Sequence, residues 1–227
     1  MRSEHVVGAE PEAVVEVRAV LFDMDGTLVD STEVVELLWA RFADRYGVDL
    51  VTLLAYAHGR QTRDTIARFL PPGHDADAVT AAFEEVELVT TDGVKEIPGA
   101  RRLLDGLAGA RVAVVTSAPR ALAEVRMAAA GVRIPEVLVS SEDVTRGKPD
   151  PEGYLTAASR LGVAATDCLV IEDAEAGIRA GLASGARVLV VGSHSSATAD
   201  PLPHVADLTR VAATAVDGGI RLRWSGS

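Results

Sequence analysis

Two aspartates separated by one methionine follow an apolar run in the stretch VLFDMDGTLVDS, residues 20–31. Residues i and i+2 of an extended chain face the same way, so Asp23 and Asp25 are expected to lie about 6–7 Å apart on one side of the backbone. Like charges placed so closely in a partly desolvated site repel each other strongly. A divalent cation relieves this repulsion, and ligands that are all oxygen favour Mg²⁺. The pair therefore predicts a magnesium site.

Other polar residues follow two further apolar runs. Glu172 and Asp173 come after the run at 168–171, and Thr116 and Ser117 end the run at 112–116. Each group alone is usually an ordinary turn or helix cap. Their joint occurrence favours a functional site, because the backbone N–H groups of a helix N-terminus beside a hydroxyl bind anions.

Lys148, in the loop RGKPDP, is one of only two lysines in a chain with 20 arginines. A lysine ammonium is a compact point charge that binds phosphoryl oxygens well. With Thr116 and Ser117 it predicts a phosphate site next to the metal.

The elements that must bring these residues together are predicted from apolar runs and helical spacing. Five apolar runs are predicted as strands, at 19–22, 112–116, 136–140, 168–171 and 187–191. Four of them are short and rich in valine, as is typical of parallel strands buried on both faces. Helices are predicted between them at 118–131, 150–162 and 175–185. This alternation predicts an α/β fold with a doubly wound (Rossmann-like) parallel sheet, in which ligands bind beyond the carboxyl ends of the strands.

The alternation stops after the first strand. Four segments with helical spacing follow one another, at 33–47, 50–59, 62–71 and 75–90. We therefore predict a core domain formed by residues 1–32 and 97–227, and an inserted helical cap domain at 33–96. The segment 217–227 is expected to form a short edge strand, and residues 1–18 receive no assignment.

Composition limits the classes of partner. The net charge of −11 and the pI of about 4.9 argue against nucleic acid and membrane surfaces as partners. Cys168 is the only cysteine, so no internal disulfide is expected, and it is interpreted as a small buried residue of a strand. The sequence shows neither a signal-peptide pattern nor an apolar run long enough to span a membrane, so a cytoplasmic protein is expected.

The polar groups resemble the four motifs of the haloacid dehalogenase-like hydrolase superfamily. These are DMDGT from Asp23, Thr116, Lys148 in GKPDP, and IEDAEAGI with Glu172 and Asp173. The resemblance spans positions 19 to about 192. The helical insertion resembles the cap shared by β-phosphoglucomutases and small sugar-phosphate phosphatases.

The resemblance implies a role for each motif residue. Asp23 attacks phosphorus and forms an aspartyl-phosphate, and Asp25 protonates the leaving oxygen and then activates water. Mg²⁺ is held by Asp23, the backbone carbonyl of Asp25 and Asp173, with Glu172 as a ligand or a neighbouring partner. Thr116, Lys148 and the backbone N–H of Ser117 bind the phosphoryl oxygens. The resemblance also favours a monomer acting on a small phosphorylated metabolite.

Branches of the superfamily differ at positions present here. Asp25 argues against dehalogenase chemistry, and Lys95, which follows the cap helices, argues against phosphonate hydrolysis. β-Phosphoglucomutases have a histidine at the position of Val35, so a phosphatase acting on small sugar or polyol phosphates is favoured. A mutase, or a catalytically silent phosphate-binding sensor, remains the alternative.

The cap segment AHGRQTRDTIARF, residues 57–69, resembles that of polyol and sugar phosphatases. We expect His58 and Arg60 to contact the hydroxyls or phosphate of the substrate. The alternative is a surface arginine and a histidine bonded to nearby backbone.

Overall fold

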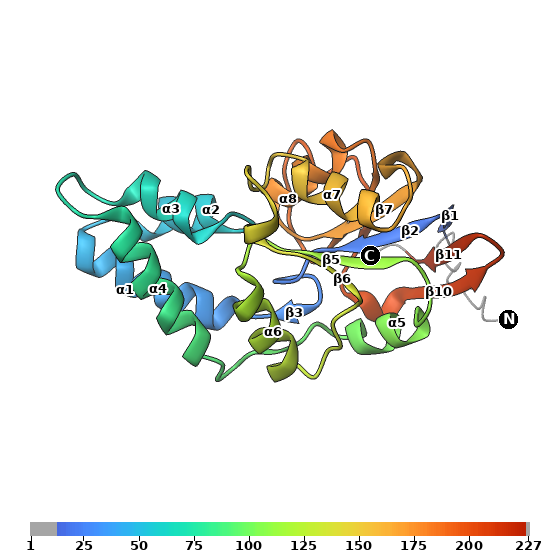
Figure 1. Cartoon of the computed structure of the whole chain (residues 1–227), viewed down its shortest axis with the longest axis horizontal. Helices are drawn as coiled ribbons and strands as arrows, with labels where there is room; N and C mark the ends of the chain where they lie inside the picture. Colours follow the sequence, from blue (N-terminus) through green and yellow to red (C-terminus); the bar gives the residue numbers. More distant parts are fainter. Residues whose placement is uncertain (1–12, 226–227) are drawn as a thin grey trace, which may run out of the picture.

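A six-stranded parallel sheet forms the centre of the protein in the computed structural model, which describes residues 13–225 (Figure 1). In spatial order its strands are β6 (Val137–Val139), β5 (Val112–Val115), β2 (Ala19–Phe22), β7 (Cys168–Glu172), β8 (Arg187–Val191) and β9 (His204–Val205). The first five match the predicted strands, and β9 adds a short edge strand. The predicted α/β fold is confirmed.

Helices cover both faces of this sheet, as expected for a doubly wound fold. They are α5 (Ala100–Gly106), α6 (Arg120–Ala129), α7 (Glu152–Arg160) and α8 (Glu175–Ala183). Alternate residues of β2 face opposite sides, because side chains alternate along a strand. Val20 and Phe22 pack with α5 and α6, and Ala19 and Leu21 pack with α7 and α8. Burial on both faces explains why these strands are apolar throughout.

Four of the five helices between β2 and β5 pack together beside the sheet (Figure 1). They are α1 (Thr32–Tyr46), α2 (Leu50–Ala57), α3 (Thr62–Phe69) and α4 (Ala76–Val89). An apolar cluster of their own includes Trp39, Phe42, Leu53 and Ile66, and the rings of Trp39 and Phe83 stack with centroids 4.3 Å apart. The helices are where the sequence predicted them; the division into two domains at 33–96 stays a prediction.

A two-stranded ribbon joins the cap helices to the sheet. The chain passes through β3 (Val29–Asp30) before α1 and through β4 (Lys95–Glu96) after α4, and the two strands pair antiparallel. Nζ of Lys95 lies 3.4 Å from Oδ2 of Asp30, so the second lysine has an ion-pair partner at this junction.

A second, three-stranded antiparallel sheet lies against the α5 side of the core. Its strands are β1 (Ala13–Val17), β11 (Gly219–Trp224) and β10 (Val211–Val216), in that spatial order. The segment 217–227 was expected at a sheet edge, and this was wrong: β11 is the middle strand, with Ile220, Leu222 and Trp224 in the core. Residues 1–12 and 226–227 lie outside the described residues.

Short 3₁₀ turns complete the assignment, at Ser141–Asp143, Ala165–Asp167 and Leu208–Arg210. Among the described residues, no helix has both the length and the apolar character needed to cross a bilayer.

Candidate active site

A cavity of about 400 Å³ lies between the cap helices and the carboxyl ends of the central strands. Seven of the predicted site residues line it: Asp23, Asp25, Thr116, Ser117 and Asp173 from the core, and His58 and Arg60 from the loop after α2. The sheet brings them together because Asp23 directly follows β2, Thr116 follows β5 and Asp173 follows β7. The parallel arrangement places these three strand ends at one edge.

Lys148 and Glu172 complete the set from the protein interior. Nζ of Lys148 donates to Oδ1 of Asp23, to Oε1 of Glu172 at 2.7 Å and to the carbonyl of Val115 at 3.1 Å. All three N–H groups of the ammonium therefore have acceptors. The lysine bridges the ends of β2, β5 and β7, so it fixes Asp23 relative to the neighbouring strands.

Glu172 is fully buried, and both of its oxygens accept hydrogen bonds from the protein. Oε1 also accepts from the hydroxyl of Tyr154 at 3.0 Å, and Oε2 accepts from the backbone N–H groups of Asp173 and Ala174 at 2.8 and 3.0 Å. Gly177 is required beside it, because a Cβ at that position would overlap the carboxylate of Glu172. The protein thus holds this carboxylate rigidly beneath the cavity.

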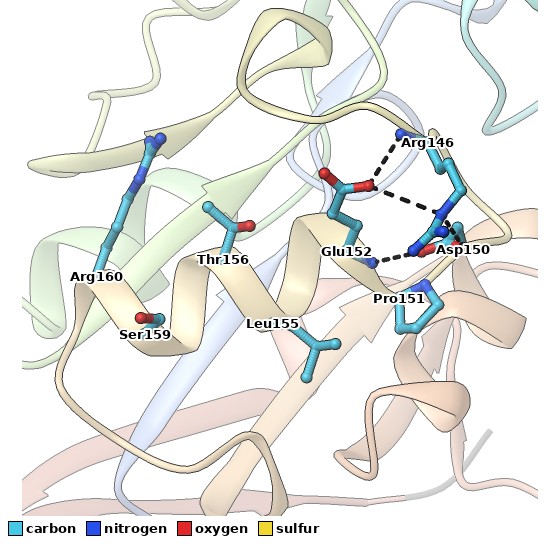
Figure 2. A pocket seen from close by; sticks show the side chains of 8 residues that line it. All are labelled: Arg146, Asp150, Pro151, Glu152, Leu155, Thr156, Ser159 and Arg160. Carbon is cyan, nitrogen blue, oxygen red and sulfur yellow. Dashed lines mark hydrogen bonds and ion pairs between the residues drawn. The ribbon is translucent and has the colours of Figure 1, made fainter.

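The loop that carries Lys148 is fixed from its outer side by α7. The carboxylate of Glu152 accepts from the backbone N–H groups of Thr145 and Arg146 at 2.9 and 3.0 Å, and Nε of Arg146 lies 2.7 Å from Oδ2 of Asp150. Figure 2 shows Arg146, Asp150 and Glu152 in an open surface pocket along α7, where they interact with one another. We therefore interpret the residues that line this pocket as support for the loop.

Burial and mutual repulsion raise the pKa values of Asp23 and Asp173. Burial raises the pKa of Asp23 to about 8; Lys148 opposes the rise and Glu172 adds to it. Burial and the charges of Glu172 and Asp23 also raise the pKa of Asp173 well above its usual range. Burial alone would lower the pKa of Lys148, but Asp23 and Glu172 hold it well above its ordinary value. A cation at this place would favour the charged carboxylates.

The acidic cluster has the donor set of a site for a hard cation. Asp23, Glu172 and Asp173 each offer a carboxylate oxygen, and these oxygens lie within 4.8 Å of one another. The hydroxyl of Thr27 donates to Oδ1 of Asp173 at 3.1 Å and orients it. Gly26, at φ +88°, lies so close that a Cβ there would overlap the carboxylate of Asp173. Oxygen donors alone match the preference of Mg²⁺.

The loop after α2 is seated directly on the core. Oγ of Ser117 donates to the carbonyl of Gly59 at 2.8 Å, and a Cβ at Gly59 would meet Cβ of Ala174 at 3.0 Å. The guanidinium of Arg60 lies over the ring of Tyr56, 4.3 Å from its centroid. This loop therefore closes one side of the cavity.

Several residues that the sequence did not predict belong to the same region. They are Thr27, Ser31, Glu87, Arg126, Tyr154, Glu175 and His194. One signal was available for Arg126, which interrupts the buried stripe of Leu122, Ala123 and Met127 on α6. A cation at an apolar position implies a buried acidic partner. For Glu87, which reaches the site from α4, the pairing with Arg126 across 39 positions gave no local signal.

Comparisons with known proteins show what this chain is similar to. The family model for haloacid dehalogenase-like hydrolases matches residues 17–185. Hexitol phosphatase A of Escherichia coli is 43% identical over 178 residues, covering 76% of this chain and 82% of its own. Validoxylamine A 7'-phosphate phosphatase of Streptomyces hygroscopicus is 36% identical over 210 residues, covering 86% and 95%. The crystal structure of CbbY from Rhodobacter sphaeroides in complex with phosphate shares the fold, with a TM-score of 0.72, 23% identity and coverage of 85% and 95%.

Proposed function

This chain belongs to the haloacid dehalogenase-like hydrolase family, and on that premise we propose that it is a Mg²⁺-dependent phosphatase of small phosphorylated sugars or polyols. The observation that supports this most directly is the cavity of about 400 Å³, whose floor holds Asp23, Asp25 and Asp173. A cavity of this size accommodates a small phosphorylated metabolite. The names of the two phosphatases reported above support the substrate class.

In the proposed first step, a carboxylate oxygen of Asp23 attacks phosphorus and the bond from phosphorus to the leaving oxygen breaks. Asp25 donates its proton to that oxygen, so the alcohol leaves neutral. In the second step water attacks phosphorus, the bond from phosphorus to the oxygen of Asp23 breaks, Asp25 accepts one proton of the water, and inorganic phosphate leaves. Asp23 and Asp25 return to their starting states.

Other groups of the chain bind and orient the phosphoryl group. Thr116 is buried at the cavity wall, with its hydroxyl accepting from the backbone N–H of Ala118 at 3.0 Å, so its own proton is free to donate. Lys148 holds Asp23 in place and supplies positive charge behind it. The free hydroxyl proton of Thr116 supports its predicted phosphate-binding role, and Lys148 contributes its charge through Asp23, because its three N–H groups already have acceptors. The backbone N–H of Ser117 is proposed to bind a phosphoryl oxygen beside Thr116.

The residues present fit Mg²⁺. Asp23, Asp173 and the backbone carbonyl of Asp25 would hold the ion, with Glu172 as a partner beneath them, because its oxygens already accept four protein hydrogen bonds. The ion would neutralise charge on the phosphoryl oxygens.

Val35 lines the cavity at the position where mutases of the family carry a histidine, which supports hydrolysis over transfer to a second sugar hydroxyl. The test is phosphate release from a panel of sugar and polyol phosphates, with Mg²⁺ and with EDTA, beside Asp23→Asn. Release that requires Mg²⁺ and is lost in the variant is expected. Interconversion of glucose phosphate isomers without release would instead identify a mutase, and binding without turnover a sensor.

A further inference from the structure

One buried arginine connects the floor of the cavity to the cap. Arg126 lies on α6, with only 3% of its surface exposed. Its Nη1 donates to Oδ2 of Asp25 at 3.0 Å, and its Nη2 donates to Oε1 of Glu87, on α4, at 2.9 Å. A single guanidinium therefore joins the loop after β2, a core helix and a cap helix.

The charges of this bridge depend on one another. Glu87 is 5% exposed; burial raises its pKa, and Arg126 opposes that rise. The hydroxyl of Thr62, on α3, donates to the other oxygen of Glu87 at 3.3 Å. A buried ion pair adds little net stability compared with apolar residues of similar size, whereas removing one partner is costly. Stability alone gives little reason for a buried arginine paired with two carboxylates, Glu87 in the interior and Asp25 at the cavity.

The bridge also defines the orientation of Asp25. Its Oδ1 accepts from Oγ of Ser31 at 2.6 Å, and its Oδ2 accepts from Arg126. Each contact is single, so each carboxylate oxygen retains a second lone pair. The plane of the carboxyl group is thus fixed while an oxygen stays able to give or take a proton, which needs a donor–acceptor distance of about 2.6–3.2 Å.

We propose that Arg126 is a positioning residue, which orients the carboxyl group of Asp25 for proton transfer and, through Glu87, makes that orientation depend on helix α4. This inference rests on the proposed phosphatase function. Because Arg126 acts through Asp25, its removal should lower kcat/KM most for esters whose leaving oxygen must be protonated.

The experiment measures kcat/KM for phosphate esters with increasingly basic leaving groups: 2,4-dinitrophenyl, 4-nitrophenyl and phenyl phosphate, and glycerol phosphate. Dinitrophenolate leaves without protonation, whereas an alkoxide does not. For Arg126→Gln we expect kcat/KM on glycerol phosphate to fall by about 10²-fold, within the usual contribution of general acid catalysis, with little change on dinitrophenyl phosphate. The dependence on leaving-group pKa therefore becomes steeper.

Arg120→Gln is the matched control, because Arg120 lies on the same helix and donates instead to the carbonyl of Leu138 and to Asp143. In this control variant kcat/KM should depend on leaving-group pKa as it does in wild type. Glu87→Gln, which leaves the pair of Arg126 and Asp25 intact, should steepen the dependence less than Arg126→Gln. The double variant should match Arg126→Gln alone, because both substitutions break one bridge.

An equal loss on all four esters would show that Arg126 only supports the fold, and a gain on glycerol phosphate would show that it holds Asp25 away from the substrate; both overturn the inference. If Arg126→Gln fails to fold, Glu87→Gln and the double variant, which removes both charges of the Arg126–Glu87 pair, give the same comparison. If kcat/KM depends on leaving-group pKa in both of these variants as it does in wild type, the inference is also overturned. Wild-type protein that releases no phosphate from any ester contradicts the proposed function itself.

Discussion

The ammonium of Lys148 lies 2.7 Å from Oε1 of Glu172, and both groups are buried beneath the strand ends that carry Asp23 and Asp173. The opposite charges of the pair attract each other strongly because solvent cannot screen them. Lys148 and Glu172 therefore hold each other in place, and through their hydrogen bonds they also position Asp23 and Asp173. The arrangement makes the acidic floor of the cavity dependent on a carboxylate that itself has no free oxygen.

Glu172→Gln tests that dependence. The amide replaces one accepting oxygen with an NH₂ group, which would face donors on either side of the carboxylate. We expect the Mg²⁺ concentration for half-maximal phosphate release to rise by about 10- to 100-fold, the usual effect of losing a residue that supports metal ligands. Glu136→Gln, at an exposed glutamate outside the acidic cluster, is the control. The same Mg²⁺ requirement in Glu172→Gln and wild type would contradict the prediction.

Gly177→Ala tests the close packing around the same carboxylate. The added Cβ would overlap Glu172, so the free energy of unfolding should fall by about 1–3 kcal/mol, as for other overpacked interiors. Gly106, also helical, has open space where its Cβ would be, and Gly106→Ala should raise the free energy of unfolding by about 0.5–1 kcal/mol. Urea unfolding measures both. A neutral Gly177→Ala would mean that Glu172 can move.

Arg60→Ala tests the predicted contact between the cap loop and the substrate. Arg60 lines the cavity, so its loss should raise KM for a polyol phosphate by about tenfold or more, the value of one charge-assisted hydrogen bond. Arg68→Ala is a close control, because Arg68 stacks on the same Tyr56 ring, 4.7 Å from its centroid, from α3. Equal effects of the two substitutions would assign Arg60 to packing against Tyr56.

Asp143→Asn tests an electrostatic contribution to stability. Burial alone would raise the pKa of Asp143, but hydrogen bonds from Arg160 and from the backbone N–H of Ser140 lower it to about 2. A lowered pKa stabilises the fold above the unfolded value near 4, and this is lost as pH falls from about 4 to about 2. The variant should be less stable than wild type by about 2 kcal/mol at pH 7. The difference should shrink as pH falls below about 4 and vanish only below about pH 2 in urea unfolding, and a difference independent of pH would show that charge is not the cause.

The central strands and the core of the site followed from the sequence because their signals are local. The run AVLF at 19–22 is apolar throughout, and Asp23, Thr116, Lys148 and Asp173 stand at the ends of such runs or in short loops. The three-stranded sheet of β1, β11 and β10 could not be predicted from the sequence, because its pairing joins distant segments, with Val17 opposite Ile220. The same holds for Arg126 and Glu87, whose meeting depends on how α4 packs against the core.

The ribbon of β3 and β4 has a consequence for how this protein could be altered. The whole cap leaves and re-enters the core at two hydrogen-bonded neighbours, Asp30 and Lys95, so its ends are held side by side whatever lies between them. A helical segment from a relative could be exchanged at this junction as a cassette without changing the spacing of the strand ends. Under the proposed function, in which His58 and Arg60 contact the substrate, this exchange would change substrate selectivity separately from the chemistry, provided that the incoming segment supplies a carboxylate where Glu87 meets Arg126.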